Sequence, residues 1–359
     1  MQSPSLLIVL LCCLCVSCKP SAPTTVAPIA SATIAKWHDN HRAAISLTHD
    51  AGWLSEEAVG KVNALVLESR LHLGYEMVTA NFRQYPELME YYRRSMSGES
   101  FSLFGHGDTH IDHDKLEYDS AFASFSRCAA TMQSFGLRPI AYAYPNGGGF
   151  LSSTQRAVAN AGFLSARAFS FGVGEKSLIM PDSITTPENW YLLPSLVMQD
   201  FAFEHCDTCI NSNQELVPYL DAAVRRSAWL TLTYHAIGDE QGWGYYKLSE
   251  FRADIAAVLA RDFWSASLQD ITLYARERAK AHIELNMLDD TIEIKVTDNL
   301  DNILYNYPLT VVLRLPSTWK GKAATLTLEG RREQVYSRLT DSLLLHLLPN
   351  ERTYKLSLQ

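Results

Sequence analysis

Three short segments of the chain carry side chains that could perform hydrolytic chemistry together. SLTHDAG contains Asp50, and LTYH ends at His235. HGDTH contains His106 and His110, and two imidazoles at that spacing lie on one face of a helical turn and can bind one divalent metal ion. Such an ion polarises a carbonyl and acidifies a water, while an aspartate can take a proton and a histidine can protonate the leaving group. These residues therefore predict metal-assisted hydrolysis.

Apolar segments alternate with amphipathic segments around these residues. The pattern predicts parallel βα units, in which active residues gather at the carboxyl ends of the strands. Six or seven units in about 240 residues fit an α/β barrel slightly smaller than the eightfold one. The expected strands are 43–49, 75–82, 102–107, 140–145, 164–170 and 229–236, and the expected helices are 55–70, 115–135, 151–161, 213–227 and 248–261.

The pattern of polar and apolar residues changes after Ala281. Short alternating segments such as IELNML, YPLTVVLRLP and RTYKLSLQ follow, separated by Asp, Asn, Pro and Gly. This is typical of a small antiparallel β-sandwich. We therefore expect a barrel over residues 37–281 and an all-β sandwich over residues 282–359, which would act as a stabilising or binding module.

The N-terminus has the pattern of an export signal. The apolar run from Leu6 to Val16 is too short to span a bilayer and is typical of a signal-peptide core. Cys18 follows a small residue, as in a bacterial lipobox, so residues 1–18 predict a lipoprotein signal peptide. Residues 19–36 are rich in small residues, Pro and Thr, and suit a flexible tether. The expected product is an exported periplasmic or outer-membrane lipoprotein anchored at Cys18, with secretion as the alternative.

The composition of the chain indicates which kinds of molecule it could bind. The net charge of −8, without a basic stripe, argues against a nucleic-acid partner and favours a neutral or weakly charged substrate. Contact with a membrane is expected only through the lipid anchor. The CDTC segment, with Cys206 and Cys209, predicts either a small disulfide loop or two free thiols, and Cys128 a buried thiol.

Several motifs, in order, resemble those of the polysaccharide deacetylases, the NodB-homology or carbohydrate esterase family 4 enzymes. SLTHDAG resembles the first motif, T-F-D-D-G, and HGDTH the metal-binding H-x-x-x-H. AYPNG resembles the third motif, GFLSARAF the strand that contains an Arg, and LTYH the last motif. The resemblance covers residues 40–265. It implies a distorted (β/α) barrel of about seven strands, here with a C-terminal all-β sandwich domain, and the removal of acetyl groups from sugars.

The resemblance also implies a role for each matching residue. Asp50 would be the general base, His235 the general acid, and His106 and His110 the ligands of a divalent metal ion, with zinc expected. The backbone N–H of Asn146 would help to hold the oxyanion. The substrate would be an acetylated carbohydrate, and the candidate residues that contact it are Trp243, Tyr144 and Arg167. Trp243 lies in a glycine-flanked loop and could instead pack as a lid.

Two alanines depart from the family pattern. Ala51 stands where the second Asp, normally the third metal ligand, is expected, and Ala143 stands where an Arg often orients the catalytic Asp. Arg167 is a candidate for that orienting role. Either another group fills the third ligand position, or Asp50 itself turns to the metal and the base is lost. The possible substitutes are His49, Asp108, Asp112 and His113.

These departures keep two further functions open. The first is a catalytically degenerate deacetylase fold that binds a glycan in the cell envelope without cleaving it. The second is a structural envelope module whose β-sandwich contacts a partner protein.

Overall fold

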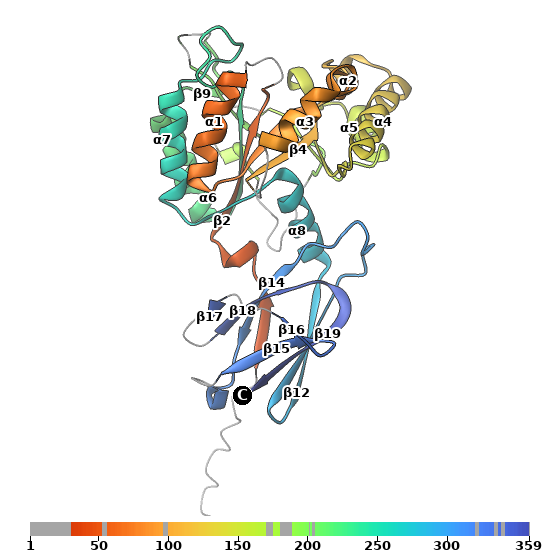
Figure 1. Ribbon diagram of the computed structural model, residues 1–359, viewed down its shortest axis with the longest axis vertical. Coiled ribbons are helices and arrows are strands. Elements are labelled where there is room, and N and C mark those ends of the chain that lie inside the picture. The colour runs from red at the N-terminus through yellow and green to blue at the C-terminus, as the bar shows by residue number, and fades with distance from the viewer. Residues whose placement is uncertain are drawn as a thin grey trace, which may run out of the picture.

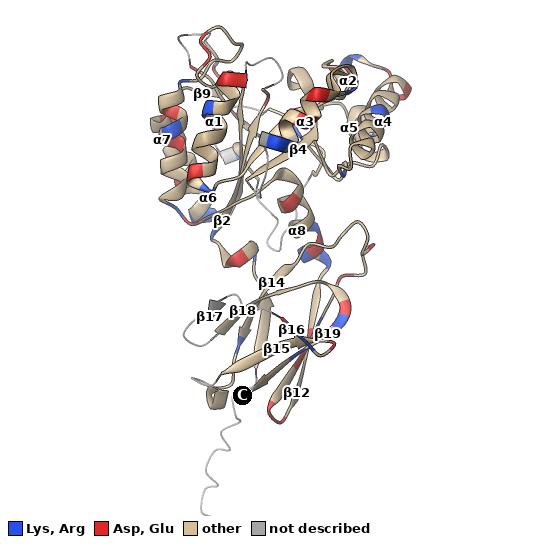
Figure 2. Cartoon of the chain, viewed as in Figure 1, with Lys and Arg blue, Asp and Glu red and all other residues tan. Residues whose placement is uncertain are grey.

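The chain folds into an α/β domain and a β-domain (Figure 1). The computed structural model describes residues 30–51, 56–95, 100–169, 175–179, 189–200, 202, 205–319, 323–333, 337–338 and 342–358. Acidic and basic residues are intermixed along the helices of the α/β domain (Figure 2). In the part of the chain described, no helix is long and apolar enough to cross a membrane.

The α/β domain is built on a sheet of ten described strands, curled into a distorted barrel. The main path runs β6-β5-β4-β3-β2-β10-β8-β9, with every pair parallel; β11 adds to β2 in parallel, and the short β7 pairs antiparallel with β10. The central strands β2 and β10 are buried along their whole length, as expected when both faces of a parallel sheet are covered. The strands are β2 (Ala43–His49), β3 (Leu73–Met77), β4 (Phe101–Gly105), β5 (Ala141–Ala143), β6 (Ser165–Arg167), β7 (Leu178–Ile179), β8 (Leu196–Met198), β9 (Cys209–Ile210), β10 (Trp229–Tyr234) and β11 (Phe263–Ser265).

Helices cover this sheet on both flanks. Figure 1 shows α1, α6 and α7 on one side and α2 to α5 on the other, with α8 near the β-domain. The helices are α1 (Glu56–Ser69), α2 (Thr79–Gln84), α3 (Pro86–Ser95), α4 (Tyr118–Ser134), α5 (Ser152–Asn160), α6 (Asn213–Arg226), α7 (Leu248–Leu259) and α8 (Leu268–Lys280). Short 3₁₀ turns are η1 (His38–Asn40), η2 (His113–Lys115), η3 (Pro145–Gly147), η4 (Glu175–Ser177) and η5 (Ser317–Trp319). The predicted α/β barrel with a C-terminal β-domain is confirmed.

Several expected strands were too long, and the one over 75–82 differs most in kind. The structure ends β3 at Met77 and forms α2 from Thr79, although the sequence predicted a strand over 75–82. Val78 and Phe82 are four positions apart and both buried, so their spacing fits a helical face as well as an alternating strand. Helices α3 and α8 were also not expected.

The β-domain contains two antiparallel sheets. One has the order β1-β14-β18-β17 and the other β12-β13-β19-β15-β16. The first pairs β1 with β14, so residues 31–34 belong to a sheet and not to the tether predicted over residues 19–36. The strands are β1 (Ser31–Ile34), β12 (His282–Leu288), β13 (Thr291–Thr297), β14 (Leu309–Arg314), β15 (Ala324–Leu328), β16 (Arg331–Glu333), β17 (Ser337–Arg338), β18 (Ser342–Leu347) and β19 (Asn350–Leu358).

A shared core joins the two domains. Trp264 and Tyr274 of the α/β domain pack in one buried cluster with Val311 and Leu345 of the β-domain. The predicted signal peptide and Cys18 lie outside the described residues.

The structure shows which of the described cysteines are paired. Cys206 and Cys209 form a disulfide, which decides between the two alternatives for CDTC. Cys128 is a buried free thiol, as predicted.

Glu277 should make stability depend on pH. Its side chain is buried in α8 and accepts the backbone N–H of Tyr307, and burial raises its pKa to about 8. Since that value lies above the ordinary pKa of 4.5, the folded state retains the proton more firmly than the unfolded state. The stabilisation by Glu277 should be complete below pH 4.5 and be lost as the pH rises toward 8. Glu277→Gln, which stays neutral, should flatten the decline of the melting temperature between those pH values.

A matched control tests this expectation. Glu284 is exposed on β12, so Glu284→Gln should leave the pH dependence of melting as in the wild type. An unchanged pH profile in Glu277→Gln would show that Glu277 is ionised in the folded protein at neutral pH.

Candidate metal centre and active site

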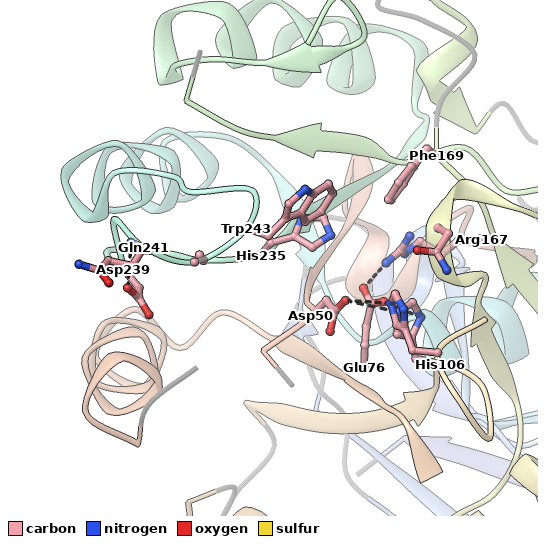
Figure 3. Close-up of a pocket in the computed structure, with 13 residues that line it drawn as sticks. Asp50, Glu76, His106, Arg167, Phe169, His235, Asp239, Gln241 and Trp243 are labelled. Carbon is pink, nitrogen blue, oxygen red and sulfur yellow. Dashed lines mark hydrogen bonds and ion pairs between the residues drawn. The ribbon is translucent and has the colours of Figure 1, made fainter. Parts of the chain in front are cut away.

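A cavity of about 720 Å³ opens at the carboxyl ends of the barrel strands. Asp50 follows β2, His106 follows β4, and His235 follows β10, so parallel neighbours deliver all three to one place. Figure 3 shows Asp50, Glu76, His106 and Arg167 linked by a row of interactions, with His235 and Trp243 beside them and Asp239 and Gln241 farther out. The lining residues are Asp50, Glu76, His106, His110, Asn146, Arg167, Phe169, His235, Ala236, Asp239, Gln241, Gly242 and Trp243.

Asp50, His106 and His110 form a candidate metal centre. Asp50 Oδ2 lies 3.3 Å from His106 Nε2 and 3.8 Å from His110 Nε2, and one ligand atom of each residue lies within 4.8 Å of the others. His106 Nε2 is buried and lacks a hydrogen-bond partner with good geometry among the described residues. Two imidazoles and a carboxylate suit a cation of the zinc type. The residues present therefore fit the cation that the motifs predicted.

The two histidines lie in a loop and not on a helical turn, contrary to the prediction from their spacing. Gly107 follows His106 with a φ of +90°, and a Cβ there would lie 2.8 Å from the carbonyl O of Thr109. The loop is fixed to the neighbouring strand because the N–H of His106 donates to Met77 O at 2.9 Å and that of Thr79 to Gly107 O at 3.0 Å. This bend brings the two rings to a centroid distance of 4.8 Å.

Glu76 is a site residue that the sequence analysis missed. It is fully buried on β3, where its Oε1 pairs with the guanidinium of Arg167. Its Oε2 lies 3.0 Å from His106 Nδ1, which also lies 3.1 Å from Ala143 O. Two acceptors at Nδ1 keep the proton on that nitrogen and leave Nε2 to face Asp50. The signal in the sequence was a lone Glu inside the buried strand LGYEM.

The charges of this group determine the pKa of each member. Burial alone would lower the pKa of His106, but Glu76 and Asp50 outweigh it and raise the pKa to about 10. Burial would raise the pKa of Glu76, but Arg167 and His106 lower it to about 2. In the same way, His106 holds the pKa of Asp50 well below its usual value despite burial. The negative charge that holds a proton on His106 would equally attract a cation to Nε2.

The position of Ala51 explains how a centre can form without the second Asp of the motif. Ala51 is 4% exposed and lines a small cavity with Val59 and Phe82, and it does not line the larger cavity that contains the histidine pair. Asp50 occupies the place beside both histidines. This position is the one expected if Asp50 itself were to serve as a metal ligand.

The four possible substitutes for the third ligand all have other partners. His49 Nε2 lies 2.6 Å from His235 O, and Asp108 pairs with Arg83 and Arg127. Asp112 accepts the N–H of Asp114 and pairs with Lys115. His113 is buried against Phe125, and its Nε2 lies 3.0 Å from Ser124 Oγ.

His235 and Trp243 form the other side of the cavity. His235 is 7% exposed, and burial lowers its pKa to about 4, so the imidazole is neutral at neutral pH. Its ring meets the Trp243 ring edge-on at 4.5 Å. Trp243 is 58% exposed and presents a large aromatic surface to solvent. Asn146, in a left-handed conformation with φ of 56°, also lines the cavity.

Two candidate substrate contacts differ from expectation. Tyr144 is 1% exposed and its hydroxyl donates to Tyr191 O at 3.0 Å, so it belongs to the core and does not line the cavity. Arg167 lines the cavity but pairs with Glu76, and not with Asp50 as its suggested orienting role required. Its charge therefore balances the buried carboxylate of Glu76 beside the candidate metal centre.

We compared the chain with known protein families, sequences and structures. No protein-family model matches the chain. A gellan lyase from a Bacillus species is 25% identical over 316 residues, which are 82% of this chain but only 12% of the lyase. The chain therefore spans a small fraction of the length of that relative.

Two solved structures share the fold. A Mycobacterium smegmatis structure described as a polysaccharide deacetylase matches with a TM-score of 0.50 and 18% identity over 68% of this chain and 93% of its own. Agd3, described as a novel carbohydrate deacetylase, matches with a TM-score of 0.51 and 11% identity over 89% of this chain and 65% of its own. The barrel, the order of its motifs and these neighbours agree, and the chain has the fold of the polysaccharide deacetylases, the NodB-homology or carbohydrate esterase family 4 proteins.

Proposed function

We propose that the chain is a metal-dependent deacetylase that hydrolyses N- or O-acetyl groups on a carbohydrate. The observation that carries the proposal is the cluster of Asp50, His106 and His110 within 4.8 Å at the mouth of a deacetylase barrel. Zinc is the cation that best matches two imidazoles and a carboxylate. When bound there, the cation would polarise the acetyl carbonyl and lower the pKa of a water.

The surrounding residues supply the remaining chemistry. Asp50, whose Oδ2 lies beside the Nε2 atoms of His106 and His110, would hold the cation together with these two imidazoles. Neutral His235 can accept a proton and return it to the leaving amine or alcohol, so one residue serves as base and then as acid. The backbone N–H of Asn146 is the proposed donor to the oxyanion.

The proposed substrate is a glycan. Trp243 offers an exposed ring at the cavity rim on which a sugar can stack. The name of the Bacillus relative, a gellan lyase, is consistent with a polysaccharide partner. We also propose export and anchoring at Cys18, in agreement with the Cys206–Cys209 disulfide, since disulfides persist in oxidising compartments.

Cation content and acetate release test the proposal together. His106→Ala and His110→Ala should each bind about one equivalent less zinc than the wild type, because each removes one of three ligands. Both should also fail to release acetate from acetylated oligosaccharides that the wild type cleaves. Equal zinc in all three proteins, with glycan binding but no acetate release, would favour the glycan-binding alternative.

A further inference from the structure

A second group of metal-ligand side chains lies where the two domains meet. His38 and Asp39 belong to η1, which connects β1 of the β-domain to β2 of the barrel. His346 lies on β18 of the β-domain. None of the three lines the barrel cavity, so this group, here named the junction triad, is independent of the proposed active site.

The fold holds the junction triad from both sides. The ring of His38 stacks on Trp264 at 5.4 Å and meets Tyr274 edge-on at 6.1 Å, both in the α/β domain. On the other side, the N–H of Asp39 donates to Thr310 Oγ1 of β14 at 2.9 Å. The side chains of His38 and His346 are 18% and 9% exposed. The imidazoles are therefore positioned by packing and are not mobile surface groups.

Within the junction triad, one carboxylate lies between two imidazoles. Asp39 Oδ1 is 2.6 Å from His346 Nε2, and Asp39 Oδ2 is 3.5 Å from His38 Nδ1. The ring centroids of His38 and His346 are 4.2 Å apart. One ligand atom of each of the three residues lies within 4.8 Å of the others. Ligands of a tetrahedral zinc ion are separated by about 3.3 Å, given bonds of about 2.0–2.1 Å. Small side-chain shifts would therefore bring all three donors onto one ion.

We propose that His38, Asp39 and His346 bind a divalent cation of the zinc class and that this ion links the β-domain to the barrel. Two nitrogens and one carboxylate oxygen favour zinc over magnesium or calcium, which prefer oxygen ligands. Asp39 is 47% exposed, so solvent can reach the fourth position. Because His346 comes from a strand far along the chain from η1, the ion would add a crosslink between two segments that lie far apart in the sequence.

Zinc titration of a protein that lacks the first centre tests this proposal. In the double variant His106→Ala and His110→Ala, equilibrium dialysis should still find about one equivalent of zinc. Adding His346→Gln, whose amide nitrogen replaces Nε2, should lower zinc affinity at least about tenfold and abolish the rise in melting temperature that zinc produces. His41→Asn is the matched control, since His41 lies beside η1 but pairs with Asp262; it should keep full zinc binding.

The outcomes separate the two sites. If the double variant binds no zinc, or if His346→Gln binds it as tightly as the control, the junction triad is only a hydrogen-bonded contact. Asp39→Asn, which retains an oxygen acceptor but not the charge, decides the question if His346→Gln fails to fold. None of these results affects the proposed deacetylase centre, which the single His106 and His110 variants test.

Discussion

Asp50→Asn should fold normally and lose both its bound cation at the barrel and its activity. Asp50 Oδ2 lies 3.3 Å and 3.8 Å from the Nε2 atoms of His106 and His110, so a neutral amide there removes the carboxylate from the proposed ligand set. We expect zinc affinity at this centre to fall by about 100-fold or more and acetate release by about 1000-fold. Zinc titration and an acetate-release assay on the same preparation measure both effects.

Asp239→Asn provides the control for this substitution. Asp239 lines the outer part of the same cavity, away from the linked group in Figure 3. Its variant should keep zinc affinity within about twofold, since no ligand is lost. If Asp50→Asn loses turnover but binds zinc like the wild type, Asp50 is the general base implied by the first motif and a different group completes the centre.

Glu76→Gln should both destabilise the protein and weaken the metal centre. Glu76 and Arg167 are fully buried and paired, and loss of one charge leaves the other without compensation. Breaking such a pair costs about 3–5 kcal/mol in the free energy of unfolding. Because Glu76 also orients His106 through Nδ1, zinc affinity should fall by about 10–100-fold. Denaturant unfolding and zinc titration measure the two effects separately.

A double substitution distinguishes the two roles of Glu76. Glu76→Leu combined with Arg167→Met removes both buried charges, so stability should recover toward that of the wild type. Zinc affinity should remain low, because His106 still lacks its partner. Recovery of zinc affinity along with stability would mean that Glu76 only maintains the fold and does not orient the ligand.

The sequence predicted the convergence of the site because of how parallel strands are built. β2 and β10 are apolar runs that end in a few polar residues, and the carboxyl ends of neighbouring strands meet at one edge. Asp50, His106 and His235 could be placed together on that basis alone. The loop conformation of the histidine pair could not, because it depends on hydrogen bonds to β3.

The features that the sequence did not predict depend on contacts between distant residues. Glu76 and Arg167 are 91 positions apart, and neither carries a local signal of its partner. β1 is a short segment of small residues whose strand character comes from pairing with β14, near the other end of the chain. Local composition therefore favoured a tether there.

The pairing of β1 with β14 has a consequence for the whole molecule at a cell surface. Among the described residues, the chain enters the β-domain first, passes through η1, and then begins the barrel (Figure 1). The cavity opens at the ends of β2 and β10 that lie away from η1. If the N-terminus is anchored in a membrane, the β-domain stands between the lipid and the catalytic opening. Under the anchoring proposed above, the β-domain would act as a spacer, and the cavity would face away from the bilayer.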